Sequence, residues 1–148
     1  MLDPDFAFGF ANNAGLLLWL ALAVSLFAER ARRLVWPLTQ FIAPGLWAGA
    51  YVVLLAQGLG EAKGGFDSIE GVRALFANDS ALAAGWLHYL AFDLFVGTWI
   101  ARDSVERRVN GLLVLPCLVL TLLAGPAGFL LYLALRAALA RRADPETN

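Results

Sequence analysis

The sequence predicts an all-α protein, an integral membrane bundle of four transmembrane helices that forms a single domain over residues 1–148. Composition is the first observation: 60% of the residues are hydrophobic and 16% are charged, which is more apolar than a water-soluble domain sustains. Patterning is the second, since four long apolar segments are separated by short polar ones. Each span needs about 20 residues, so four spans leave no room for a second catalytic domain.

The first two helices are expected at 13–28 and 44–58. The first is a short, uninterrupted apolar run that stops at the charged stretch 29–33, which is expected to be a loop. Pro44 favours the start of the second helix, because its missing N–H has no partner in a first turn.

The third and fourth helices are expected at 80–101 and 112–135. A polar loop at 60–79 precedes the third helix, and residues 68–76 within it have the pattern of a short amphipathic helix at the membrane interface. Three successive N-cap residues, Asn78-Asp79-Ser80, favour a helix start at the end of this loop.

Glycine and proline predict one helix break and one helix contact. Gly125-Pro126 interrupts the last apolar segment near its middle, where the proline leaves the carbonyl of Leu122 without its helical partner. If the last two helices are antiparallel neighbours, the break lies at the depth of Asp93 and suggests a cavity. The alternative is an ordinary kink that improves packing. A small-xxx-small glycine pair at 45–49 is typical of a close helix contact.

The distribution of charge argues against nucleic acid as a partner and bears on the orientation of the chain in the membrane. The net charge is −1 and the arginines are divided among short interhelical segments, so the sequence predicts no nucleic acid binding. Lysines and arginines number none before the first helix, three after it, two in the next loop, three in the next and three in the tail. By the positive-inside rule the first four segments place the N-terminus on the non-cytoplasmic side, whereas the tail contradicts them.

Asp93 is the most informative position. An ionisable side chain well inside a transmembrane helix costs about 2.5–3.5 kcal/mol and requires a compensating partner. Its carboxyl must face protein or trapped water, where it can serve as an acid or a base. Tyr89 lies one turn earlier, at i,i+4, and its hydroxyl can donate to the carboxylate. The alternative is an aspartate that only hydrogen-bonds a neighbouring helix and locks the bundle.

His88 is turned about 140° from Asp93 around the same helix, so the two are not adjacent on one face. It shares a stripe with Phe92 and Trp99, and it is either a structural histidine or a group for proton transfer or ligand binding. A metal site has little support, because the chain has one histidine and one cysteine, Cys117. A single axial ligand to haem stays open.

Polar and aromatic side chains suit both structural and ligand-binding roles. Arg102, Asp103 and Ser104 end the third helix at the level of the headgroups, either as solvated anchors or as a polar clamp at the mouth of a pocket. Five tryptophans and ten phenylalanines offer flat surface for a polyene or another isoprenoid, and they equally suit lipid-facing positions.

Three strings carry a family resemblance: 65–76 (GFDSIEGVRALF), 85–97 (GWLHYLAFDLFVG) followed by Trp99, Asp103 and Ser104, and 114–132 (VLPCLVLTLLAGPAGFLLY). They resemble the ABA4-like family, four-helix membrane proteins related to the plant chloroplast neoxanthin synthase. The resemblance covers about half the chain. The acidic residues 1–5 are unlike a transit peptide or a cleavable signal. The chain is thus similar to a bacterial relative, for which the inner membrane is the expected location.

The resemblance implies isomerisation of a carotenoid 5,6-epoxide to an allenic alcohol, with no net redox change and no cofactor. Such a reaction needs an acid beside the epoxide oxygen and a base beside the polyene carbon that loses its proton. Within the family motif lie His88, Tyr89, Asp93 and Asp103. We expect Asp93 and His88 to form the acid/base pair, meeting through a water or the substrate, with Tyr89 orienting Asp93.

The same resemblance implies an apolar polyene or isoprenoid ligand taken from the lipid bilayer, and a homo-oligomer stays open. The residues expected to contact this ligand are Trp86, Phe92, Trp99, Arg102 and Asp103. Two alternatives to an isomerase are a membrane protein that binds a pigment, retinoid or haem, and an accessory subunit of a membrane complex without catalysis.

Overall fold

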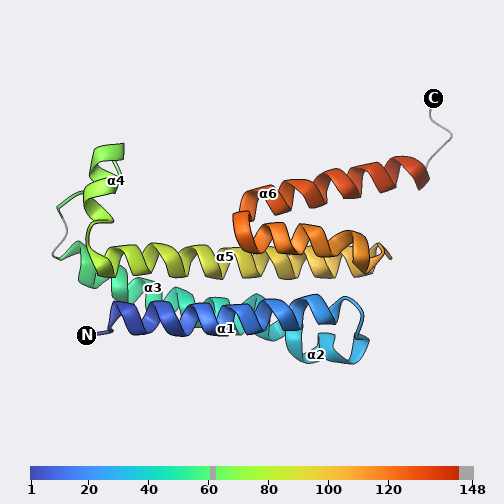
Figure 1. Ribbon diagram of the computed structural model, residues 1–148, viewed down its shortest axis with the longest axis horizontal. Helices are drawn as coiled ribbons and strands as arrows, with labels where there is room; N and C mark the ends of the chain where they lie inside the picture. Colours follow the sequence, from blue (N-terminus) through green and yellow to red (C-terminus); the bar gives the residue numbers. More distant parts are fainter. Residues whose placement is uncertain (61–62, 144–148) are drawn as a thin grey trace.

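The computed structural model describes residues 1–60 and 63–143, and these residues form helices and connecting turns without a β-strand (Figure 1). Within these described ranges, four helical stretches are long and apolar enough to cross a membrane: Pro4–Ser25, Glu29–Leu59, Asp79–Glu106 and Gly111–Arg141. The predicted all-α class is confirmed for the described part of the chain. The elements are α1 (Pro4–Ser25), α2 (Glu29–Pro37), the π-helical turn η1 (Leu38–Ile42), α3 (Ala43–Leu59), α4 (Ile69–Leu75), α5 (Asp79–Glu106) and α6 (Gly111–Ala143).

α1 begins at Pro4 and not near residue 13. The side chain of Asp3 caps the helix by accepting the backbone N–H of Phe6 at 2.8 Å, and Pro4 occupies the first turn, where its missing N–H costs nothing. The acidic start of the chain is therefore the N-cap of the first long helix.

The second long helix begins at Glu29, so the charged stretch 29–33 is helical and not a loop. α2, η1 and α3 follow one another without a break from Glu29 to Leu59. The π-helical turn lies between Pro37 and Pro44, at which the regular hydrogen-bond pattern is interrupted because proline has no N–H. From its position in this helix, Arg32 donates hydrogen bonds to the backbone carbonyls of Ser25 and Leu26 at the end of α1, at 2.9 Å each.

The polar loop contains the expected short helix. α4 is capped by Ser68, whose hydroxyl accepts the N–H of Gly71 at 3.0 Å. α5 is capped by Asn78, which accepts the N–H of Ala81 at 3.1 Å, and the helix extends to Glu106, beyond the expected end at 101. Within the predicted loop 60–79, positions 61 and 62 lie outside the described residues.

α6 is a helical hairpin (Figure 1). At Ala124 and Gly125 the backbone leaves helical geometry, with φ/ψ of −154°/49° and 2°/−77°. The chain reverses direction there, and we call residues 111–123 the first arm and residues 126–143 the second arm. The break expected at Gly125-Pro126 is confirmed, and it is a reversal in place of a kink.

Both arms of α6 contact α5. Leu122, at the end of the first arm, contacts Tyr89, whereas Tyr132 of the second arm contacts Asp103 near the end of α5. The second arm therefore returns toward the end of α5 from which the first arm set out. At a rise of about 1.5 Å per residue the first arm is about 20 Å long, shorter than a bilayer core of about 30 Å. A straight fourth span at 112–135 is thus replaced by a hairpin.

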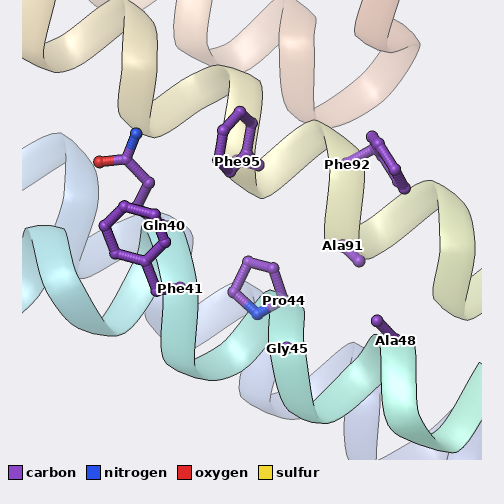
Figure 2. A pocket seen from close by; sticks show the side chains of 8 residues that line it. All are labelled: Gln40, Phe41, Pro44, Gly45, Ala48, Ala91, Phe92 and Phe95. Carbon is purple, nitrogen blue, oxygen red and sulfur yellow. The ribbon is translucent and has the colours of Figure 1, made fainter.

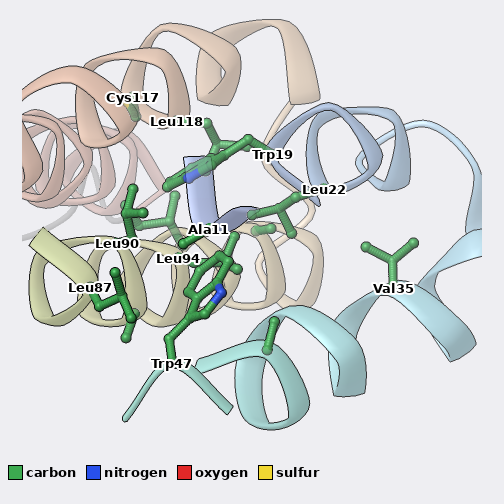
Figure 3. Packing of buried hydrophobic residues seen from close by; sticks show 14 of the residues in the cluster. Ala11, Trp19, Leu22, Val35, Trp47, Leu87, Leu90, Leu94, Cys117 and Leu118 are labelled. Carbon is green, nitrogen blue, oxygen red and sulfur yellow. The ribbon is translucent and has the colours of Figure 1, made fainter. Parts of the chain in front are cut away.

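The core lies where α1, α3 and the first arm of α6 meet α5, which contacts all three. Figure 3 shows the indole rings of Trp19 and Trp47 packed among Leu87, Leu94 and Leu118. All five side chains are buried. α5 is consequently the central helix, and its different faces meet different neighbours.

Gly128 permits the close approach of the two arms, and its substitution tests the hairpin. A Cβ at this position would overlap Thr121 and the carbonyl of Cys117 in the first arm. Gly128→Leu is expected to lower the free energy of unfolding by about 1–3 kcal/mol or more, because overpacking forces the arms apart. Thermal unfolding in detergent measures this. Gly49→Leu is the matched control, since no atom lies within 4 Å of a Cβ there, and equal losses in both variants would contradict the hairpin contact.

Candidate functional site

Asp93 lies on α5 at the level of the reversal in α6. A Cβ added at the buried Gly125 would overlap the Asp93 carboxylate, so the bare backbone of the reversal packs directly on the acid. Among the described residues, Oδ2 of Asp93 is buried without a hydrogen-bond partner. The structure therefore places a carboxyl group with a free oxygen against a broken helix, as the depth argument from the sequence anticipated.

Tyr89 joins this carboxyl group to the helix break. Its hydroxyl donates to the carbonyl of Leu122 at 3.2 Å, which is the carbonyl that Pro126 leaves without a helical partner. The same phenol lies beside the Asp93 carboxylate, one turn along α5. Asp93, Tyr89 and the reversal of α6 form one site, which we call the hairpin site.

An apolar cavity of about 260 Å³ opens beside the hairpin site, between α1, α5 and α6. Tyr89 forms part of its wall, and the indole of Trp86 stacks on the phenol with ring centroids 5.2 Å apart. Trp86 is held by α1, because its Nε1–H donates to Oδ1 of Asn12 at 2.9 Å. The lining residues are Asn12, Gly15, Leu16, Trp19, Trp86, Tyr89, Leu90, Leu122 and Leu123.

His88 lies on another face of α5, toward α3. Its ring centroid is 5.6 Å from that of Tyr51 and 4.6 Å from that of Phe92. The structure thus brings Tyr89 to Asp93 and does not bring His88 there. Direct contact between His88 and Asp93 is absent because five residues turn the helix by about 140°.

A second apolar groove, of about 310 Å³, lies between α3, η1 and α5 on the side of His88 (Figure 2). We call it the α3–α5 groove. Phe92, one of the expected ligand contacts, lines this groove and not the cavity beside Tyr89. Its lining residues are Gln40, Phe41, Pro44, Gly45, Ala48, Ala91, Phe92 and Phe95.

Trp99 and Asp103 hold the second arm of α6. Asp103 Oδ2 accepts the hydroxyl of Tyr132 at 2.6 Å and Nε of Arg107 at 2.8 Å, and Oδ1 lies 3.7 Å from Arg136. Trp99 packs edge-on against Tyr132, with centroids 5.8 Å apart. We call this cluster the arm clamp. Two expected ligand contacts are therefore anchors of the hairpin.

Arg102 points to yet another neighbour, Gln40 of η1, to whose side-chain oxygen it donates. The five expected ligand contacts are thus distributed over three sides of α5, with Trp86 alone beside the hairpin site. The partners Asn12 and Tyr132 had no local signal in the sequence, since each contact joins residues far apart in the chain. In the described part of the chain, no group of three or more His, Cys, Asp or Glu side chains is placed to hold a metal ion.

Comparison with known proteins gives one match. The family model described as ABA4-like, ABA DEFICIENT 4-like, matches residues 6–132, which is most of the chain and includes most of α1, all of α5 and the hairpin site. No curated protein and no solved structure matches the sequence.

Proposed function

Because the chain belongs to the ABA4-like family, we propose that it is a membrane-embedded isomerase that opens the epoxide of a carotenoid, or of another isoprenoid, to an allenic alcohol. The hairpin site is the observation that carries this proposal. It offers a carboxyl group with a free oxygen, a phenol beside it and an apolar cavity at the same level of the bundle.

The reaction requires one proton to be given and one to be taken. The C–O bond at the polyene side of the epoxide breaks, the oxygen becomes a hydroxyl group, and a C–H bond on the next carbon breaks as the allene forms. Product and substrate have the same atoms and the same oxidation level. The carboxyl group of Asp93 can donate a proton to the epoxide oxygen through one of its oxygens and accept the proton of the C–H bond through the other. One group suffices because the epoxide oxygen and the departing hydrogen are close neighbours in the substrate.

Tyr89 has two tasks in this proposal. Its bond to the Leu122 carbonyl fixes the phenol against the hairpin, and its position beside Asp93 lets it orient the carboxyl group or the epoxide oxygen. The cavity that it lines is mostly apolar and bears the indoles of Trp19 and Trp86, which suit the flat polyene chain.

The decisive experiment is expression in a host that accumulates violaxanthin, with chromatography of the pigments. We expect Asp93→Asn to lower product formation by about 100-fold or more and Tyr89→Phe to lower it less, because the amide cannot exchange protons whereas loss of the phenol only loosens the geometry. His88→Phe is the matched control on the same helix. It is expected to retain activity, since the imidazole faces α3.

Three other results of these experiments would contradict the proposed site or the proposed reaction. Loss of product in His88→Phe would favour Asp93 and His88 as an acid/base pair over Asp93 as the sole proton-transfer group. A wild-type protein that forms no new pigment in any carotenoid background would end the isomerase proposal. A purified wild-type protein that carries a pigment in its absorption spectrum without converting it would favour the binding-protein alternative.

A further inference from the structure

Two arginines converge on one indole ring near the end of α5. The guanidinium carbon of Arg32 lies 5.7 Å from the centre of the Trp36 ring, and that of Arg102 lies 5.6 Å from it. Arg32 donates to the carbonyls that end α1, and Arg102 donates to Gln40, so both are bound to neutral oxygens. Among the described residues, neither has a carboxylate partner within ion-pair distance. In this part of the structure, two positive charges therefore lie together without an ion pair.

This pair of charges adjoins the α3–α5 groove. Gln40, the partner of Arg102, is also part of the groove wall (Figure 2). On α5, Phe95 lies in the wall, and Arg102 follows it by seven residues, which places both on one face of the helix. An apolar groove therefore runs from the cationic end along α3 and α5, from Gln40 to Ala48 on one wall and from Phe95 to Ala91 on the other.

The position along the helices matches a membrane interface. Arg102 precedes the end of α5 at Glu106 by one turn, and Arg32 lies in the first turns of the second long helix. Arg30 and Arg33 add positive charge nearby. Phosphate groups of lipids lie at this depth, and arginine binds phosphate oxygens with two parallel hydrogen bonds.

We propose that the protein binds an anionic phospholipid here, with its phosphate on Arg32 and Arg102 and one acyl chain in the α3–α5 groove. Charge complementarity selects an anionic over a zwitterionic headgroup, and the groove selects a lipid over a soluble phosphate. The site is on the opposite side of α5 from the cavity at Tyr89 and does not depend on the proposed reaction.

The test uses the full chain in detergent, with native mass spectrometry to count bound lipid. Phosphatidylglycerol and phosphatidylcholine of the same chain composition are added in parallel. We expect phosphatidylglycerol to be retained preferentially, and Arg102→Gln to weaken its binding about tenfold, because one charge-assisted contact is lost. Arg141→Gln removes an equal charge away from the groove and is expected to leave binding unchanged.

Gly45→Phe tests the acyl chain independently of charge. Gly45 lines the groove with no atom within 4 Å of a Cβ, so the ring can fill the groove without disturbing the helices. Weaker phosphatidylglycerol binding in this variant, with unchanged thermal unfolding in lipid-free detergent, is expected. Equal retention of the two lipids, equal losses in Arg102→Gln and Arg141→Gln, or unchanged binding in Gly45→Phe would each overturn the proposal.

Discussion

Cysteine labelling will place the end of α6 on the same side of the membrane as the turn between α1 and α2. The reason is the hairpin: α1, the stretch from Glu29 to Leu59, and α5 each run through the bundle once, and α6 then enters and returns. We therefore expect three crossings, which would place the start of α1 and the end of α6 on opposite sides of the membrane. Four straight spans would place them on the same side.

The hairpin also removes the contradiction in the charge distribution. With α6 folded back, nine of the eleven lysines and arginines lie on one side and two on the other. By the positive-inside rule we therefore expect the arginine-rich side to be cytoplasmic and the N-terminal side to be non-cytoplasmic. The nine are Arg30, Arg32, Arg33, Arg102, Arg107, Arg108, Arg136, Arg141 and Arg142, and the two are Lys63 and Arg73.

The measurement uses single cysteines in a Cys117→Ser background and a membrane-impermeant maleimide on intact cells. Phe66→Cys, in the loop before α4, is expected to react at once, whereas Glu29→Cys and Ala140→Cys react only after the membrane is opened. Each position is outside the core, so the variants keep the fold. Reaction of Ala140→Cys together with Phe66→Cys in intact cells would show a fourth full crossing and refute the hairpin topology.

Local signals predicted the parts of the fold that depend on neighbouring residues. The cap at Asn78, the short helix after Ser68 and the interruption at Gly125-Pro126 are all where the sequence indicates. The direction taken after the interruption was not predictable. It depends on the contact of Tyr132 with Asp103, which joins residues 29 positions apart.

The prediction of a loop at 29–33, which was based on its charge, is wrong. The stretch 29–33 has the composition of a loop, yet it forms the start of a helix because Arg32 finds the free carbonyls of α1. The glycine pair at 45–49 has open space around both members and marks no helix contact, whereas Gly128, which has no second glycine four residues away, does. The spacing of small residues in the sequence indicates only where a close helix contact can form, and the packing of the helices determines whether it forms.

For the candidate site, helical geometry predicted more than residue chemistry did. The i,i+4 relation placed Tyr89 beside Asp93, and the missing N–H of Pro126 identified the Leu122 carbonyl that Tyr89 binds. The angular argument likewise separated His88 from Asp93. The expected pairing of the two as acid and base, through a water or the substrate, stays a prediction.

Asp103→Asn is expected to release the second arm of α6. The carboxylate accepts the hydroxyl of the fully buried Tyr132 and pairs with Arg107 and Arg136, so the amide keeps at most part of one contact. A charge-assisted hydrogen bond contributes about 1.5–3 kcal/mol, whereas the half-exposed ion pairs add little. We therefore expect the arm to open at least tenfold more often.

Trypsin measures this opening, because cleavage in the native state follows the population of the open form and Arg136 and Arg141 lie in the second arm. Asp103→Asn is expected to speed cleavage there by about tenfold or more, and Tyr132→Phe by less, since it leaves the ion pairs in place. Glu106→Gln neutralises a nearby exposed acid and serves as the control. If Asp103→Asn and Glu106→Gln are cleaved at the same rate, the arm is held by its apolar contacts alone, and Asp103 becomes free to act in a ligand site as the sequence first suggested.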